Sequence, residues 1–228
     1  MKFSIHKEPV PHIVIDDFLP KEQNTAIFNH LIDLKDSYKQ AGIGTDQQIN
    51  NSYRSNLSLN MDQLYHLADL QDPQAALEHR ASSPLLSWLD ALLYDEKWLS
   101  FLDAAPFPLN EMRYCDYWST QVSRYGSKDQ YKWHYDTIPG DSTRVITLIY
   151  YIHHPEKEFS NGELCLTDGL LWGEELVGEN KRATIEPLNN RLVIFESKSI
   201  HAVMPTQAPE EFDKGRFSVN VWIGKYPE

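Results

Sequence analysis

The sequence predicts an α+β fold, mainly β, in which an N-terminal helical layer packs on a C-terminal β-sandwich. Two observations support this prediction. Apolar residues recur at helical spacing in residues 1–110, whereas residues 111–228 break into short β-rich runs. Gly, Asn, Asp and Pro separate these runs, which is typical of a sandwich or barrel of many short strands. Because no clean linker divides the two regions, we expect them to form one structural unit.

The N-terminal region is expected to contain one short strand and two helices. Residues 12–18 read as the strand, and Pro20 then opens a helix with one apolar face. Residues 41–60 are polar and rich in turn formers, which indicates a loop. The second helix is predicted over 84–103, because Ser83 is a favourable N-cap and is followed by proline, a favourable first helical residue.

Short strands are expected to dominate the C-terminal region. Each predicted strand is a β-rich run bounded by turn-forming residues. The predicted strands are 111–125, 131–136, 144–152, 162–167, 182–186, 191–196 and 216–223.

The composition narrows the classes of function. A net charge of -12 argues against a nucleic-acid partner, since phosphate binding relies on basic surface. No apolar run approaches the length of a membrane span, and the N-terminus lacks the apolar core of a signal peptide, so we expect no membrane partner. Cys115 and Cys165 have neither zinc nor disulfide spacing and are expected to be reduced thiols, which favours a cytoplasmic protein.

Two histidines and an aspartate form a candidate metal site. His134 and Asp136 stand two residues apart in a predicted strand, so their side chains are expected to share one face. His201 follows the apolar strand 191–196, and a sandwich can bring it opposite the pair. Two histidines and one carboxylate are the usual ligands of a non-haem Fe(II) that keeps positions open for substrate and oxygen. A His-x-Asp triplet alone also occurs by chance, so the prediction rests on all three residues.

A second candidate site lies on the predicted strand 216–223. Arg216 and Ser218 share its polar face, and a buried arginine requires an anionic partner because an unpaired buried charge is costly. That partner is either a dicarboxylate that reaches from the metal or one of the protein's own acidic side chains. Tyr151 and Tyr125 are candidates to donate hydrogen bonds from their hydroxyls to the same carboxylate. Packing in the core is the alternative role for each.

The residues of the two candidate sites and the strands around them occur in a characteristic order along the chain. Four blocks carry that order: Arg124-Tyr125-Gly126 with Tyr131, His134 and Asp136; the strand 144–151; Asn161-Gly162-Glu163-Leu164; and 187–195 with 201–205 and Arg216-Phe217-Ser218. The chain resembles the prolyl 4-hydroxylase-like branch of the Fe(II)- and 2-oxoglutarate-dependent dioxygenases, whose opening strand also looks like residues 11–19. It departs from many members of this branch in having arginine rather than lysine at the carboxylate-binding position.

The resemblance implies a fold and a set of ligands. The fold is a double-stranded β-helix, which is a jelly-roll of two facing sheets. Fe(II) is expected on His134, Asp136 and His201, with 2-oxoglutarate and O2 as co-substrates and ascorbate as a further cofactor. The residues expected to contact 2-oxoglutarate are Arg216, Ser218, Tyr151, Tyr125 and Leu164.

The implied activity is hydroxylation of a C–H bond, with release of succinate and carbon dioxide. The first substrate prediction is a prolyl residue in a protein or peptide, and the acidic net charge favours a basic partner such as a ribosomal or translation protein. A free amino acid or another small molecule is the alternative substrate. Alternatives of another class are a non-catalytic jelly-roll module that binds metal as a sensor, and a metal-dependent hydrolase or isomerase.

Three loops are expected to surround the site. The segments 41–60, 126–132 and 168–181 are candidates to form a lid or groove over it, since binding residues concentrate on loops held by a rigid scaffold. The oligomeric state stays open, with a homodimer as one option.

Overall fold

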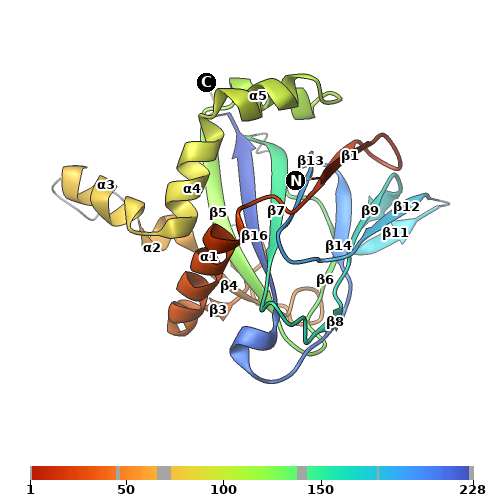
Figure 1. Cartoon of the computed structure of the whole chain (residues 1–228). Coiled ribbons are helices and arrows are strands. Elements are labelled where there is room, and N and C mark those ends of the chain that lie inside the picture. Colours follow the sequence, from red (N-terminus) through yellow and green to blue (C-terminus); the bar gives the residue numbers. More distant parts are fainter. Residues whose placement is uncertain (1, 45–46, 66–72, 138–142, 179, 226–228) are drawn as a thin grey trace.

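Two antiparallel sheets pack face to face in the computed structural model, which describes residues 2–44, 47–65, 73–137, 143–178 and 180–225 (Figure 1). The larger sheet has eight strands, in the order β1 (Lys2–His6), β2 (His12–Asp16), β13 (Arg191–Glu196), β7 (Arg144–Ile152), β16 (Arg216–Gly224), β5 (Tyr117–Tyr125), β4 (Leu57–Asn60) and β3 (Lys39–Gln40). The smaller sheet has four, in the order β12 (Arg182–Ile185), β9 (Leu164–Thr167), β14 (Ile200–Val203) and β6 (Tyr131–His134). The predicted mainly β fold with flanking helices is confirmed.

Two short pairs of strands complete the β structure of the described residues. The hairpin of β10 (Leu170–Trp172) and β11 (Glu175–Val177) lies between β9 and β12 in chain order. The second pair joins β8 (Ser160–Asn161) to β15 (Thr206–Gln207). β8 precedes β9, and β15 follows β14, so this pair extends the connections of two adjacent strands of the smaller sheet.

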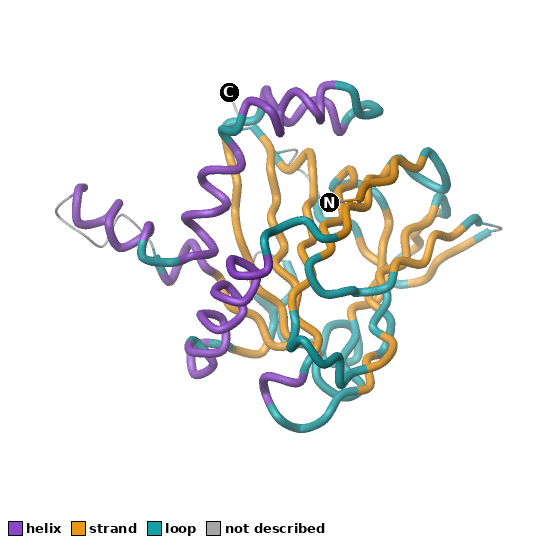
Figure 2. The backbone as a smooth tube through the Cα atoms, viewed as in Figure 1, coloured by secondary structure: helices purple, strands orange, loops and turns teal. Residues whose placement is uncertain are grey.

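Helices cover the outer face of the larger sheet (Figure 2). The α-helices are α1 (Lys21–Asp33), α2 (Met61–Leu64), α3 (Pro73–Ala81), α4 (Pro84–Leu93) and α5 (Glu96–Asp103), and the 3-10 helices are η1 (Lys35–Ser37), η3 (Leu109–Tyr114) and η4 (Phe212–Lys214). Alternate side chains of β7 and β16 face this layer, because a strand presents successive residues to opposite sides. Leu148 and Val221, which are partners in register, thus share a core with Ile27 of α1 and Leu89 of α4. Within the described residues, no helix has the length and apolar character needed to cross a bilayer.

The space between the two sheets is apolar at one end and polar at the other. Because Phe217 and Val219 face the helices, Arg216, Ser218 and Asn220 on the same strand point into this space. The apolar end is a second core, made of Ile149, Tyr151, Leu164, Leu166, Ile185, Val193 and Phe195. The polar end is where a site with charged ligands can be built.

The predicted helix 84–103 is wrong as a single helix, because the chain forms α4 and α5 there. Asp95 lies between them and accepts a hydrogen bond from the Trp98 backbone N–H at 2.7 Å. This is an N-cap, and it begins a new helix because it satisfies an N–H that has no partner within the first turn.

The predicted strands 111–125, 131–136 and 162–167 are each too long. The first begins with the 3-10 helix η3, and the second ends with β6 at His134. The third begins after Asn161 and Gly162, whose positive φ angles of 60° and 75° interrupt extended backbone.

Several elements escaped the sequence analysis. The predicted loop 41–60 contains β4, which pairs with β5, and the predicted loop 168–181 contains the hairpin β10–β11. His201 follows the strand 191–196 as predicted, but it lies in a further strand, β14. Strands β1 and β14 and helix α3 were also missed. Short polar strands are stabilised by their neighbours in the sheet rather than by their own composition, so they leave a weak signal in a sequence.

Asn190 ties the N-terminal segment to the β-sandwich. It has a φ of 64°, a left-handed conformation that asparagine tolerates better than most residues. Its side-chain oxygen accepts hydrogen bonds from the Leu19 N–H at 2.8 Å and the Tyr150 hydroxyl at 2.9 Å, and its amide donates to the Leu19 carbonyl at 2.8 Å. Pairing of β2 with β13 adds backbone hydrogen bonds between the same regions.

We expect Asn190→Ala to lower the free energy of unfolding by about 2–3 kcal/mol, because it leaves buried polar groups unpaired and keeps an unfavourable backbone conformation. Urea denaturation followed by tryptophan fluorescence measures this change. Asn190→Gly should recover only part of this stability. Glycine adopts the left-handed conformation without strain, but it does not restore the hydrogen bonds of the asparagine side chain. If Asn190→Ala were as stable as the wild type, the hydrogen bonds of Asn190 would not stabilise the fold.

Candidate active site

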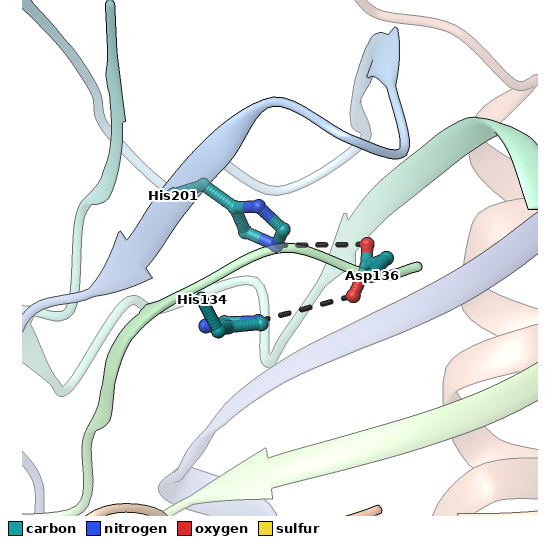
Figure 3. Close-up of side chains that lie close together, drawn as sticks. All are labelled: His134, Asp136 and His201. Carbon is teal, nitrogen blue, oxygen red and sulfur yellow. Dashed lines mark ion pairs between the residues drawn. The ribbon is translucent and has the colours of Figure 1, made fainter. Parts of the chain in front are cut away.

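Two histidines face each other across neighbouring strands of the smaller sheet. His134 ends β6 and is the direct antiparallel partner of His201 in β14. Asp136 follows β6, and its carboxylate reaches both imidazoles (Figure 3). Its Oδ1 lies 3.8 Å from Nε2 of His134, and its Oδ2 lies 3.5 Å from Nε2 of His201. One potential ligand atom from each of the three residues lies within 4.8 Å of the others.

Contacts outside β6 hold Asp136 in place. We expected strand alternation to align it with His134, but the strand ends before it. Its N–H instead donates to the Ser197 carbonyl at 2.8 Å, and Arg144 Nη1 donates to its carbonyl at 3.0 Å. Thr147 Oγ1 donates to its Oδ2 at 2.7 Å. The sequence predicts a turn at residues 137–141, of which only Thr137 lies within the described residues.

The histidine tautomers are set by the backbone. Nδ1 of His134 lies 2.7 Å from the Lys132 carbonyl, and Nδ1 of His201 lies 2.9 Å from the Ser199 carbonyl. A carbonyl only accepts hydrogen bonds, so each Nδ1 carries the proton and donates it. Each Nε2 therefore presents a lone pair toward the carboxylate, which is the arrangement that a metal-binding histidine needs.

The charges of the three groups also suit a cation. Burial lowers the pKa of His134 well below its usual value, and the nearby His201 lowers it further, so the imidazole is neutral at pH 7. Burial alone would raise the pKa of Asp136, but the neighbouring His201 and His134 and the hydrogen bond from Thr147 outweigh it, and the net pKa is lowered. The group therefore offers one anionic oxygen donor and a neutral imidazole, as metal ligands require.

Arg216 lies in the polar end of the inter-sheet space and is 1% exposed. Its Nε donates to the Gly162 carbonyl at 2.8 Å, and its Nη1 donates to Ser218 Oγ at 3.3 Å. Its Nη2 has no hydrogen-bond partner, and no described carboxylate forms an ion pair with it. The alternative that Arg216 pairs with an acidic side chain is therefore not found in the described part of the chain. The rings of Tyr125 and Tyr151 flank the guanidinium, with centroids 4.6 and 4.9 Å from its Cζ.

Two hydroxyls near Arg216 also have no hydrogen-bond partner. They belong to Tyr151, which is 0% exposed, and Thr206, which is 1% exposed. Gly162 lies against the same cluster, since a Cβ there would stand 2.7 Å from Thr206 Oγ1 and 3.0 Å from Arg216 Cδ. A buried guanidinium N–H and two buried hydroxyls without partners fit the oxygens of a carboxylate, because buried polar groups are otherwise nearly always paired.

The other residues predicted to contact 2-oxoglutarate differ in their surroundings. Ser218 contacts Arg216 directly, and the Tyr125 ring packs on it, whereas Leu164 belongs to the apolar core. Thr147 and Thr206 are site residues that the sequence did not predict. A sequence signal existed for Thr147, because it is a hydroxyl residue inside the apolar run 144–152.

A cavity of about 1060 Å³ opens beside the triad. His134, Asp136 and Tyr131 line its inner end. Its walls include residues from the predicted loop 41–60 and, from the hairpin segment, Leu171. The expectation that loops 41–60 and 168–181 border the site agrees with this lining; their action as a lid stays a prediction.

Comparison with known proteins identifies the family. Residues 120–224 match the model of the 2OG-Fe(II) oxygenase superfamily. This stretch contains the histidine–aspartate group and Arg216. Residues 120–224 are therefore a domain of that superfamily. The resemblance seen in the sequence is thereby confirmed at the level of the superfamily.

Individual relatives agree with this assignment. An uncharacterized PKHD-type hydroxylase of Synechocystis sp. is 30% identical over 213 residues, which are 92% of this chain and 62% of that protein. This chain thus spans less than two thirds of that relative's length.

Two solved structures share the fold. A prolyl hydroxylase from Trichoplax adhaerens, in complex with a hypoxia inducible factor oxygen degradation domain peptide fragment, has a TM-score of 0.61 and 18% identity, covering 94% of this chain and 83% of that one. A Pseudomonas putida prolyl-4-hydroxylase has a TM-score of 0.61 and 16% identity, covering 94% and 92%. These similarities confirm the expected jelly-roll.

The three convergent ligands predict that a divalent cation stabilises the oxygenase. Mn(II), which resists air oxidation, should raise the melting temperature, with about 2.7 kcal/mol of stabilisation at 100 times its dissociation constant. Differential scanning fluorimetry with and without the metal measures the shift. His201→Ala should abolish it, whereas His6→Ala, an exposed histidine outside the group, should keep it. An equal shift in His201→Ala would exclude this site.

Proposed function

We propose that this oxygenase uses Fe(II), 2-oxoglutarate and O2 to hydroxylate a C–H bond, with release of succinate and carbon dioxide. One observation carries the proposal: a two-histidine, one-carboxylate group shares the inter-sheet space with a buried arginine that has no acidic partner among the described residues. The group suits Fe(II) and leaves positions for co-substrates. The arginine requires an anion. A dicarboxylate bound between them meets both requirements.

The residues present fit both Fe(II) and 2-oxoglutarate. Bound Fe(II) and 2-oxoglutarate would supply the oxidising chemistry, which belongs to the cofactor rather than to the protein. His134 and His201 would offer Nε2, and Asp136 its carboxylate, with Thr147 fixing the carboxylate's orientation. The far carboxylate of 2-oxoglutarate would take the free N–H of Arg216. The hydroxyls of Tyr151 and Thr206 would donate to the same carboxylate.

The remaining co-substrate residues have supporting roles in this proposal. Ser218 accepts a hydrogen bond from Arg216 and the Tyr125 ring packs on the guanidinium, so both hold its direction. Leu164 would contribute only apolar packing beside Tyr151, with which it shares the inter-sheet core.

A prolyl residue of a protein or peptide is the proposed substrate. The support is the fold shared with two prolyl hydroxylases, one of them in complex with a peptide, and a cavity large enough for several residues of a chain. A free amino acid or another small molecule is the alternative, because the same cavity admits it. The non-catalytic sensor and the hydrolase or isomerase are disfavoured, since neither needs an anion beside Arg216.

Three further expectations stay proposals. Ascorbate would serve as a reductant, and a homodimer is one possible assembly. Cytoplasmic location is consistent with free Cys115 and Cys165.

Anaerobic loading with Fe(II) and 2-oxoglutarate tests the proposal without a known substrate. We expect a weak visible charge-transfer band, followed by succinate when oxygen is admitted. His134→Ala and Asp136→Ala should lose both signals. An iron-loaded, folded protein that gives neither band nor succinate would favour a sensor or another metal chemistry.

Gly162→Ala is expected to weaken 2-oxoglutarate binding at least about tenfold, because the added methyl group displaces Arg216 or Thr206 and a charge-assisted hydrogen bond is lost. Titration of the charge-transfer band measures the affinity. Gly178→Ala is the matched control: its φ of 79° imposes similar backbone strain, but a Cβ there meets nothing within 4 Å. Arg216→Ala should weaken binding further, and unchanged affinity in that variant would remove Arg216 from this role.

Thr147→Val should lower Fe(II) affinity about 10–100-fold, because it preserves shape but removes the hydrogen bond that orients Asp136. Competition with a fluorescent chelator measures the affinity. Thr147→Ser keeps the hydroxyl and should remain near wild type. Equal affinity of the valine and wild-type proteins would show that Asp136 does not need this support.

A further inference from the structure

The cavity beside the triad has a charge opposite to that of the whole protein. The chain has a net charge of -12. Yet the charged side chains of the described residues that line this cavity are Lys39, Arg54, Arg144 and the carboxylate of Asp136. Asp136 is the proposed metal ligand, so its charge is directed to the cation. The cavity thus presents positive charge to whatever enters it.

Arg54 is the most deeply placed of these cations, with 9% of its surface exposed. Its Nε donates to Asn56 Oδ1 at 2.9 Å, its Nη1 to the Gly42 carbonyl at 3.0 Å, and its Nη2 to Gln121 Oε1 at 2.7 Å. All three acceptors are neutral, and no described acidic side chain forms an ion pair with it. Each terminal nitrogen keeps a second N–H for another acceptor, since a guanidinium has five donors.

A stack of rings places Arg54 on the metal side of the cavity. Its Cζ lies 4.6 Å from the centroid of the Tyr131 ring. That ring in turn stacks on the His134 imidazole, with centroids 3.5 Å apart and planes 16° apart. An anion bound by Arg54 would therefore lie in the same cavity as the proposed site of oxidation, next to the ring that stacks on His134.

Arg144 lies on the same cavity and also lacks an acidic partner among the described residues. Its Nη1 donates to the Asp136 carbonyl, and its Cζ lies 4.1 Å from the centroid of the Trp222 ring. Both arginines are thus fixed by neutral groups and aromatic rings. A fixed cation that has given up water without gaining an anion is costly, and a bound anion offsets that cost.

We infer that the substrate of this oxygenase presents a carboxylate to Arg54, beside the carbon that is hydroxylated. The inference rests on the proposed function and narrows its substrate class to carboxylate-bearing molecules. It opposes the basic partner expected from the net charge, because the local charge of the cavity decides what binds there. Two sources supply such a carboxylate: an acidic side chain near the modified residue of a peptide, or the α-carboxylate of a free amino acid.

Succinate release by the Fe(II)-loaded full chain, at saturating 2-oxoglutarate, tests the inference with defined probes. One set is proline-containing peptides, blocked at both ends, with neighbouring glutamates, glutamines or lysines. The other set is free amino acids and their amides. We expect carboxylate probes to stimulate succinate release at concentrations at least about tenfold below their neutral counterparts, and increasing NaCl to weaken the effect. The set that responds identifies the source of the carboxylate.

Variants of Arg54 assign the effect to this residue. Arg54→Gln should raise the half-saturating concentration of the carboxylate probe about tenfold or more, and Arg54→Lys should recover part of the affinity. Arg182→Gln is the matched control, because Arg182 lies over the Trp133 ring at 5.2 Å but outside the cavity lining. If Arg54→Gln does not fold, the salt dependence and the matched glutamate and glutamine peptides still decide the question.

Two outcomes would overturn the inference: a preference for neutral or lysine-bearing probes, or a wild-type response of Arg54→Gln. Failure of the proposed function is separate. It appears before any probe is added, as absence of the charge-transfer band and of substrate-independent succinate. A protein that shows the band but responds to no carboxylate probe contradicts only this inference.

Discussion

A positive charge buried between two sheets, without an acidic side chain beside it among the described residues, is the constraint on which the interior of this protein depends. Arg216 is almost fully enclosed, and its neighbours are arranged to hold it rather than to neutralise it. Two tyrosine rings cover its faces, and a glycine carbonyl and a serine hydroxyl accept two of its N–H groups. The apolar residues between the sheets form only a small cluster, and one of its members, Tyr151, borders Arg216.

Five arginines of this chain differ in their partners. Arg80, Arg113 and Arg191 lie near the surface and pair with carboxylates. Arg54 and Arg216 lie inside, and their observed acceptors are neutral. Surface pairs contribute little to stability, whereas an interior cation without an anion is retained at a cost. Neutral acceptors alone do not mark a binding site, since the buried Arg124 also donates only to backbone carbonyls. The proposed ligand roles rest on the position of Arg54 in the cavity lining and on the unpaired hydroxyls beside Arg216.

Much of the fold and the site could be predicted from residue types and their order. The sandwich followed from short β-rich runs, and the metal group followed from the chemistry of histidine and aspartate. What failed depended on contacts between distant segments: the Asp136 backbone is fixed by Ser197, and its carboxylate by Thr147. Those contacts exist only after the sheets have formed. The break at Asp95 was different, because its capping chemistry is local and was present in the sequence.

The pairing of β2 with β13 has a consequence for how the chain reaches this structure. A strand near the start of the chain finds its partner near the end, and the two histidines likewise come from strands separated by much of the jelly-roll. Closing such long loops costs entropy before any contact forms, so folding is expected to be slow. During synthesis, β2 cannot pair with β13 until most of the chain has left the ribosome. The proposed metal site is therefore expected to be completed late, because its two histidines come together only when β6 pairs with β14.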